Sequence, residues 1–162
     1  MPQVFKRRII RERVLQVLYA YEMNKDNINF LEQEILSDIP EKMDEDFAHN
    51  LINGVLLHCS DLDKMIKQRV NNWEMNRIAL IDKILLRMGI CELLYFPDIP
   101  PKVSINEVIE IAKVFSTAGS GKFINGILDA ILSELKTTGN LKKTGRGLME
   151  ESIRQSPGTS KE

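Results

Sequence analysis

The sequence has few of the residues that mark disulfide-rich or metal-binding proteins. Only 2 cysteines and 2 histidines occur among its 162 residues. Cys59 and Cys91 lie far apart and form no CxxC pattern, which favours free thiols in a reducing compartment. His49 and His58 match neither the HExxH spacing nor an i, i+4 metal pair. We therefore expect neither a disulfide framework nor a bound metal, and nothing in the sequence indicates a cofactor.

Long apolar runs and an excess of one charge are also missing. Even the most apolar segment, residues 78–96, contains charged side chains, so no stretch is long enough to span a bilayer. Basic residues interrupt the N-terminus, where a signal peptide would need an apolar run. Lys and Arg total 22 against 23 Asp and Glu, for a net charge of -1, so any site for an anionic polymer must be local. We expect a cytoplasmic protein without a membrane segment.

Apolar residues recur with the period of an α-helix along most of the chain. Ile10, Val14, Val17 and Leu18 mark one buried face of a first helix. Residues 77–96 are apolar on nearly every side, which is typical of the central helix of a bundle. No segment alternates with period two, so the predicted fold class is all-α. The other expected helices are residues 30–39, 44–70 with a break near 60–61, 105–115 and 123–135.

The composition divides the chain near Lys136. After this residue Thr, Gly, Lys, Ser and Gln prevail and few residues are apolar. Such a segment buries too little apolar surface to offset the entropy lost on ordering. We expect a single helical domain over residues 1–136 and a flexible C-terminal tail over residues 137–162.

Two short motifs predict how the last two helices begin. Ser104 and Glu107 have the S-x-x-E spacing of a capping box. Residues 116–121 are small and predict a flexible loop with Ser120 as the next helix cap. Because Lys122 follows, the same loop also resembles an anion site at a helix N-terminus. It does not match a P-loop, whose first Gly and final Ser or Thr are missing. A plain connection and an anion site both remain open.

The N-terminus carries the most informative local cluster of charge. Lys6, Arg7, Arg8 and Arg11 give the first helical turns an excess of positive charge. Arg7 and Arg11 are one turn apart, and Arg8 and Arg11 are an i, i+3 pair, so the guanidinium groups can converge. Positive charge at a helix N-terminus opposes the helix dipole, and a phosphate would offset that cost. A solvated basic helix end explains the same residues.

Aromatic side chains accompany these basic residues. Unpaired RNA bases stack on such rings beside a charged groove. The helical spacing of Tyr21 and Phe123 also fits core positions, whereas Tyr19 projects from a different side of the first helix. No Ser, Cys, His or carboxylate arrangement indicates a catalytic site, so we do not expect an enzyme.

Three blocks of the sequence together resemble the NusB family. They extend from Arg7 to about Lys136, and the third is the most specific. The blocks are Lys6–Glu12 followed by Val17–Tyr19; Trp73 followed by Asp82–Met88 and Glu92–Leu93; and Pro100–Glu107 followed by Ile111–Lys113 and Lys122–Asp129.

This resemblance implies a fold, a function and two partners. The expected fold is a bundle of about seven helices in two packed helical subdomains. The expected function is transcription antitermination, especially of ribosomal RNA operons. NusB-like proteins pair with a small-subunit ribosomal protein, called NusE in this role. The pair binds the single-stranded boxA element of nascent RNA and connects it indirectly to the RNA polymerase elongation complex.

The resemblance also assigns site residues by position. RNA contacts are implied for basic residues of the N-terminus and for two residues of the last helix: Lys6, Arg7, Arg8, Arg11, Lys122 and Phe123. Contacts with NusE are implied for Tyr19 and Asp82.

Two other interpretations belong to different classes. RNA cytosine methyltransferases carry a NusB-like N-terminal domain, but this sequence contains no methyl-donor-binding domain. A helical protein-interaction module without RNA binding is the other alternative. Salt dependence separates it from an RNA-binding protein, because phosphate contacts weaken steeply as salt rises.

Overall fold

The computed structural model describes residues 3–25 and 27–149, without the side chains of residues 3–6, 72 and 73. This part of the chain contains eight α-helices, one short 3-10 helix (η1) and no strand, which confirms the all-α prediction. The helices are α1 (Gln3–Asn24), α2 (Ile28–Leu36), α3 (Lys42–Leu57), α4 (Cys59–Lys67), α5 (Asn72–Arg77), α6 (Leu80–Tyr95), α7 (Pro101–Phe115), α8 (Ala118–Thr138) and η1 (Gly145–Leu148).

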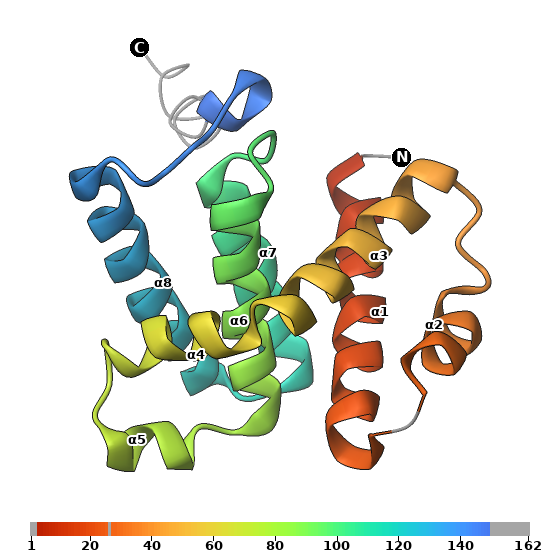
Figure 1. Cartoon of the computed structure of the whole chain (residues 1–162), viewed down its shortest axis with the longest axis horizontal. Coiled ribbons are helices and arrows are strands. Elements are labelled where there is room, and N and C mark those ends of the chain that lie inside the picture. The colour runs from red at the N-terminus through yellow and green to blue at the C-terminus, as the bar shows by residue number, and fades with distance from the viewer. Residues whose placement is uncertain (1–2, 26, 150–162) are drawn as a thin grey trace.

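The helices form two packed groups, as Figure 1 shows. On one side α1 packs against α2 and α3. On the other side α6, α7 and α8 pack against one another, with α4 beside α6. Helix α3 crosses between the groups and contacts both α1 and α6. The predicted break in the third helix falls at His58, where backbone φ and ψ leave the helical region between α3 and α4.

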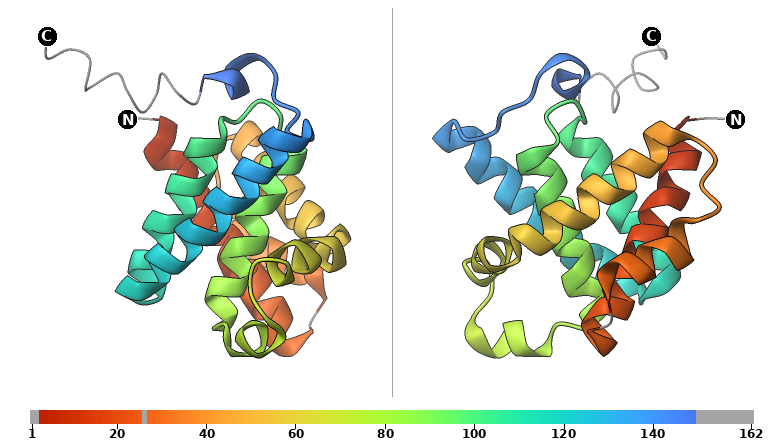
Figure 2. Two further views of the ribbon diagram at one scale, coloured as in Figure 1. Left: turned by 90° about the vertical axis from the view of Figure 1, so that its left-hand side faces the viewer. Right: turned by 45° about the vertical axis from the view of Figure 1, so that its right-hand side comes forward.

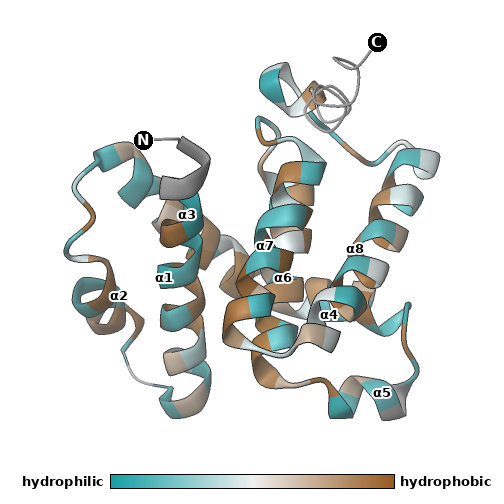
Figure 3. Ribbon diagram, turned by 180° about the vertical axis from the view of Figure 1, so that it is seen from behind, coloured by the Kyte–Doolittle hydropathy of each residue, from teal (hydrophilic) through white to brown (hydrophobic). Residues whose placement is uncertain are grey.

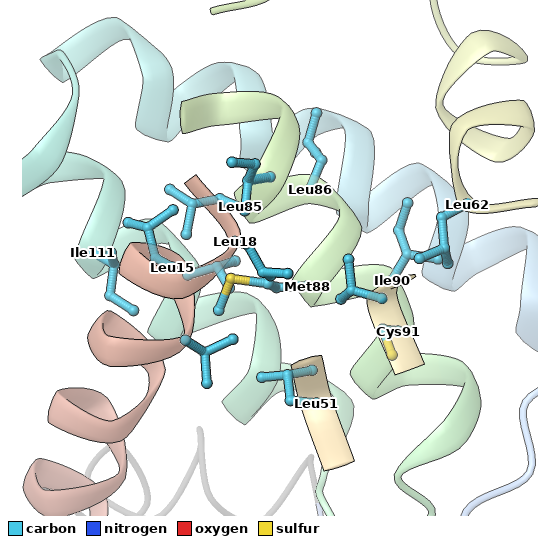
Figure 4. Packing of buried hydrophobic residues seen from close by; sticks show 14 of the residues in the cluster. Leu15, Leu18, Leu51, Leu62, Leu85, Leu86, Met88, Ile90, Cys91 and Ile111 are labelled. Atoms are coloured by element: carbon cyan, nitrogen blue, oxygen red, sulfur yellow. The ribbon is translucent and has the colours of Figure 1, made fainter. Parts of the chain in front are cut away.

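Helix α6 is the centre of the core. Its sequence is apolar on nearly every side, and the structure surrounds it with α1, α3, α4, α7 and α8. Figure 3 shows hydrophobic residues concentrated along α6, and Figure 4 shows side chains of neighbouring helices converging on it. Leu85, Met88 and Ile90 are fully buried there. An all-round apolar helix is stable in water only when it is enclosed in this way.

The close approach of α3 to α6 depends on a glycine. A Cβ atom added at Gly54 would lie 2.7 Å from Sγ of Cys91. Cys91 is itself fully buried, and burial raises the pKa of its thiol to about 12, so it stays protonated at neutral pH. The two helices therefore meet at a point where α3 has no room for a side chain.

Substituting Gly54→Ala should lower the free energy of unfolding. Overpacking of a core costs about 1–3 kcal/mol, and the higher helix propensity of alanine returns at most about 1 kcal/mol. Gly126→Ala is the matched control, because that glycine is exposed within α8 and no atom lies within 4 Å of its added Cβ. Urea unfolding should show Gly54→Ala destabilised and Gly126→Ala slightly stabilised. Equal effects would contradict a tight α3–α6 contact.

Two predicted helix starts are wrong. Helix α7 begins at Pro101, because proline suits the first helical position, so Ser104 lies inside the helix and is no cap. The Ser104 hydroxyl instead donates to Glu92 at 2.6 Å. The predicted loop over residues 116–121 is also too long, since only residues 116 and 117 lie between the two helices. Helix α8 already begins at Ala118, and the side chain of Thr117, not Ser120, accepts from a backbone N–H in the first turn.

The chain after α8 returns to the end of α6. Helix α8 ends at Gly139, whose φ of 76° is a left-handed conformation that glycine adopts readily. The Lys143 ammonium donates to the carbonyl oxygens of Glu92 and Phe96 at 3.0 and 2.8 Å, which caps the last turn of α6. Figure 2 shows this segment at the same end of the bundle as the start of α1. Residues 137–149 are thus placed, and the flexible tail stays a prediction for residues beyond them.

Candidate functional site

The arginines at the start of α1 meet carboxylates from three other helices. Arg11 is the innermost, with 2% of its surface exposed. Its Nε and Nη2 donate to the two carboxylate oxygens of Glu92 at 2.7 and 2.8 Å. Burial disfavours the charged form of Arg11, but the charge and hydrogen bonds of Glu92 outweigh it and raise the pKa of Arg11. Arg11 therefore links α1 to α6.

Arg8 and Arg7 are bound in the same manner nearer the surface. Arg8 Nε and Nη2 donate to Glu107 on α7 at 2.8 and 3.1 Å, and these bonds raise the pKa of Arg8. Arg7 Nε donates to Asp44 on α3 at 2.8 Å. The Arg7 guanidinium also lies 4.3 Å from the ring centroid of Phe47. Each guanidinium thus has a fixed orientation.

This arrangement corrects the expectation that three arginines converge on RNA. Arg11 is buried, and Glu92 occupies two of its hydrogen-bonding groups, so its direct contact with a phosphate does not fit this structure. The side chains of Arg7 and Arg8 keep 23% and 33% exposure and stay available. The side chain of Lys6 lies outside the described residues. One of these carboxylates, Glu107, was noticed in the sequence through its spacing from Ser104. It was predicted to cap a helix, whereas the structure pairs it with Arg8.

A cavity lies at the opposite end of α6, between α5, the start of α6 and the start of α8. Its volume is about 410 Å³, and its lining includes Arg77, Asp82, Thr117, Ser120 and Phe123. Asp82 is 7% exposed, and its Oδ2 accepts from the Ser120 hydroxyl at 2.7 Å. Its Oδ1 is buried without a hydrogen-bond partner in the described part of the chain. Asp82 thus places a carboxylate at the wall of the cavity, with one of its oxygens enclosed and unpaired among the described residues.

Phe123 gives this cavity an aromatic wall. It is 36% exposed, although its neighbours Ile124 and Ile127 on α8 are buried. The structure thus brings Phe123 and Asp82, which the sequence placed in different contacts, to one cavity. The alternative interpretation of Phe123 as a core residue is wrong.

A polar groove between α7 and α8 holds Lys122. The groove has a volume of about 470 Å³ and also contains Asn106, Lys113 and Asn125. Lys113 pairs with Glu110 on the same helix at 2.9 Å. Lys122 is exposed, next to Phe123 in sequence, and lies in the second turn of α8. The groove therefore carries donors suited to phosphate or sugar oxygens, together with the carboxylates of Glu110 and Asp129.

The remaining candidate residues lie apart from these sites. Tyr19 is 38% exposed on α1, in agreement with its predicted surface position. His58 stacks on Tyr95 at 4.0 Å. Within the described residues, no group of three or more His, Cys, Asp or Glu side chains is arranged to hold a metal ion. None of the helices described here is both long enough and apolar enough to cross a membrane.

The fold and its sites define an all-helical protein whose polar, partly aromatic surfaces are suited to binding. Residues 8–133 match the model of the NusB family. The chain is 48% identical over 152 residues to the transcription antitermination protein NusB of Chloroherpeton thalassium, covering 91% of this chain and 71% of that protein. It is 44% identical to the NusB of Salinibacter ruber over 95% of this chain and 98% of that one.

Solved structures agree with this comparison. T. maritima NusB superposes with a TM-score of 0.74 at 37% identity, covering 83% of this chain and 92% of that one. A structure of antitermination factors NusB and NusE in complex with dsRNA has the same fold, with a TM-score of 0.72 at 24% identity, over 83% of this chain and 99% of that one. The chain belongs to the NusB family, and the predicted membership is confirmed.

Proposed function

We propose that this NusB-family protein pairs with NusE and binds boxA-like single-stranded RNA in nascent ribosomal RNA transcripts. The pair would connect the transcript to the elongating RNA polymerase in the cytoplasm and so prevent premature termination. The curated relatives are antitermination proteins, and one protein of the same fold was solved with NusE and RNA. The role is assembly, and it requires no catalytic residue of this chain.

The cavity at the start of α6 is the observation that carries this proposal. A buried carboxylate oxygen without a donor is costly, and Asp82 Oδ1 is one. A cationic or amide side chain of NusE that enters the cavity would lie beside this carboxylate and stabilise its charge. Phe123 on the same cavity presents a ring on which an unpaired base can stack. The proposed NusE contact and the proposed RNA contact therefore lie side by side, as expected if NusE and RNA bind to one continuous surface.

Other exposed groups extend the proposed contacts. Tyr19 would add to the NusE surface from α1. Lys122 would hold RNA phosphates beside Phe123. Arg7 and Arg8 would hold phosphates at the start of α1, together with Lys6, whose side chain lies outside the described residues.

Fluorescence anisotropy with a boxA-like RNA, with and without NusE, tests the proposed function. The protein should bind this RNA more tightly than a scrambled RNA, and NusE should increase the affinity. Indifference to both the RNA sequence and NusE would refute the proposal. A protein that binds NusE alone would instead be the interaction module without RNA binding.

The double substitution Arg7→Ala and Arg8→Ala should weaken RNA binding and reduce its salt dependence. Each phosphate contact that is lost lowers the slope of log affinity against log salt by about 0.7 for a single strand. Arg13→Ala is the control, because Arg13 also lies on α1 but pairs with Asp38 beside α2. Anisotropy titrations at several salt concentrations measure both variants. Equal slopes for the double variant and the wild type would place the RNA elsewhere.

A further inference from the structure

We propose that Asp44 and Glu107 are positioning residues for RNA binding: their carboxylates fix Arg7 and Arg8 so that the remaining guanidinium N–H groups face the RNA backbone. This inference rests on the proposed function and assigns a role to two acidic residues that the RNA itself would repel. It is carried by the geometry of the two ion pairs, by their burial and by the ring beneath one of them.

Glu107 determines the orientation of the Arg8 guanidinium. Two parallel hydrogen bonds, at 2.8 and 3.1 Å, join the Nε and Nη2 side of Arg8 to both carboxylate oxygens. A bidentate contact fixes the plane of the guanidinium as well as its position. The Glu107 side chain is only 4% exposed, whereas that of Arg8 is 33% exposed. The carboxylate is thus anchored inside the protein, and Arg8 Nη1 has no hydrogen bond to any residue that the structure describes.

Asp44 and Phe47 hold Arg7 from two directions. The Asp44 carboxylate is 4% exposed and accepts from Arg7 Nε at 2.8 Å. The Phe47 ring lies under the guanidinium at 4.3 Å and is itself fixed by an edge contact with Phe96, with ring centroids 5.6 Å apart. Both Nη groups of Arg7 lack a hydrogen bond to the residues that the structure describes. A flexible side chain is therefore ordered before any RNA arrives.

If the carboxylates position the arginines, removing them should weaken RNA binding. If they act only through their charge, removing them should strengthen it. Each cancels the charge of one arginine, so on charge alone its removal should strengthen the attraction of RNA phosphates. However, an arginine side chain without a partner loses rotamer freedom when it binds RNA, and this lowers the affinity. An arginine that a carboxylate already holds in place has lost that freedom before binding. The sign of the change in RNA affinity therefore decides between the two effects.

The test substitutes Glu107→Gln, which keeps the shape but places an amide N–H₂ group against the arginine donors. We expect RNA affinity to fall by about twofold to tenfold, the range that corresponds to ordering one long side chain, although the substitution removes one negative charge. Asp44→Asn should act in the same direction through Arg7. Glu34→Gln is the matched control: it removes one negative charge in the same way, but Glu34 is exposed on α2. It should leave affinity unchanged or slightly raised.

A double-mutant cycle shows whether Glu107 acts through Arg8. In an Arg8→Ala background, Glu107→Gln should have no further effect on RNA affinity. Tighter or unchanged binding by Glu107→Gln in the wild-type background would overturn the proposal, and so would an equal loss in both backgrounds, which indicates a general change of structure. If the wild-type protein does not bind RNA, the proposed function itself is refuted. Failure of the proposed function is thus distinguishable from failure of the positioning proposal.

Discussion

Glu92→Ala should lower the free energy of unfolding by about 3–5 kcal/mol, because removing one partner leaves the other charge buried and unpaired. Glu92 is fully buried, and Arg11 and the Ser104 hydroxyl both donate to it. Urea unfolding followed by circular dichroism measures the effect. Asp38→Ala breaks the Arg13–Asp38 pair, whose carboxylate is 64% exposed, and is the control. It should cost at most about 1 kcal/mol.

A second variant distinguishes the effect of the charges from the effect of the volume that the two side chains fill. Arg11→Met combined with Glu92→Leu replaces both charges with apolar side chains of similar volume. Because such replacements are often neutral or stabilising, the double variant should recover most of the stability lost in Glu92→Ala. If Glu92→Ala unfolds at the same urea concentration as the wild type, the buried pair is not the link between α1 and α6 that the structure indicates.

Phe123→Ala should reduce RNA affinity by about fivefold to 150-fold, since base stacking on an aromatic side chain contributes about 1–3 kcal/mol per base. Phe123 is 36% exposed at the cavity that also contains Asp82. Anisotropy titration with boxA-like RNA measures the loss. Phe30→Ala is the control: Phe30 is 54% exposed on α2, away from the cavity. The same affinity for Phe123→Ala and Phe30→Ala would show that no base stacks on this ring.

The fold was predictable because its signals are local. The all-round apolar pattern of residues 77–96 identified the central helix, since no other location suits such a surface in water. The break in the third helix was predicted within three residues of His58, where the structure has it. Helix starts were less certain, because Ser104 and Ser120 both have capping side chains. Their hydroxyls bond Glu92 and Asp82 instead, which are distant in sequence.

The candidate site was predictable only in part, because its chemistry depends on distant pairs. The arginines at the start of α1 stood out by their charge, but nothing local shows that Arg11 faces Glu92, 81 residues away. Glu107 and Arg8 are 99 residues apart. Such pairs form only when three helices pack, so sequence reasoning supplied the residue types without their partners. The unpaired oxygen of Asp82 likewise becomes visible only when the surrounding helices are in place.

The buried pair of Arg11 and Glu92 also restricts how the two halves of the bundle align. Apolar contacts such as those between α1 and α6 are non-directional, so they discriminate little between registers that differ by one helical turn. A slide of that kind would move both charges into apolar surroundings and separate them. A polar pair in an otherwise apolar contact thus selects one register. Only in that register do Arg7 and Arg8 reach Asp44 and Glu107.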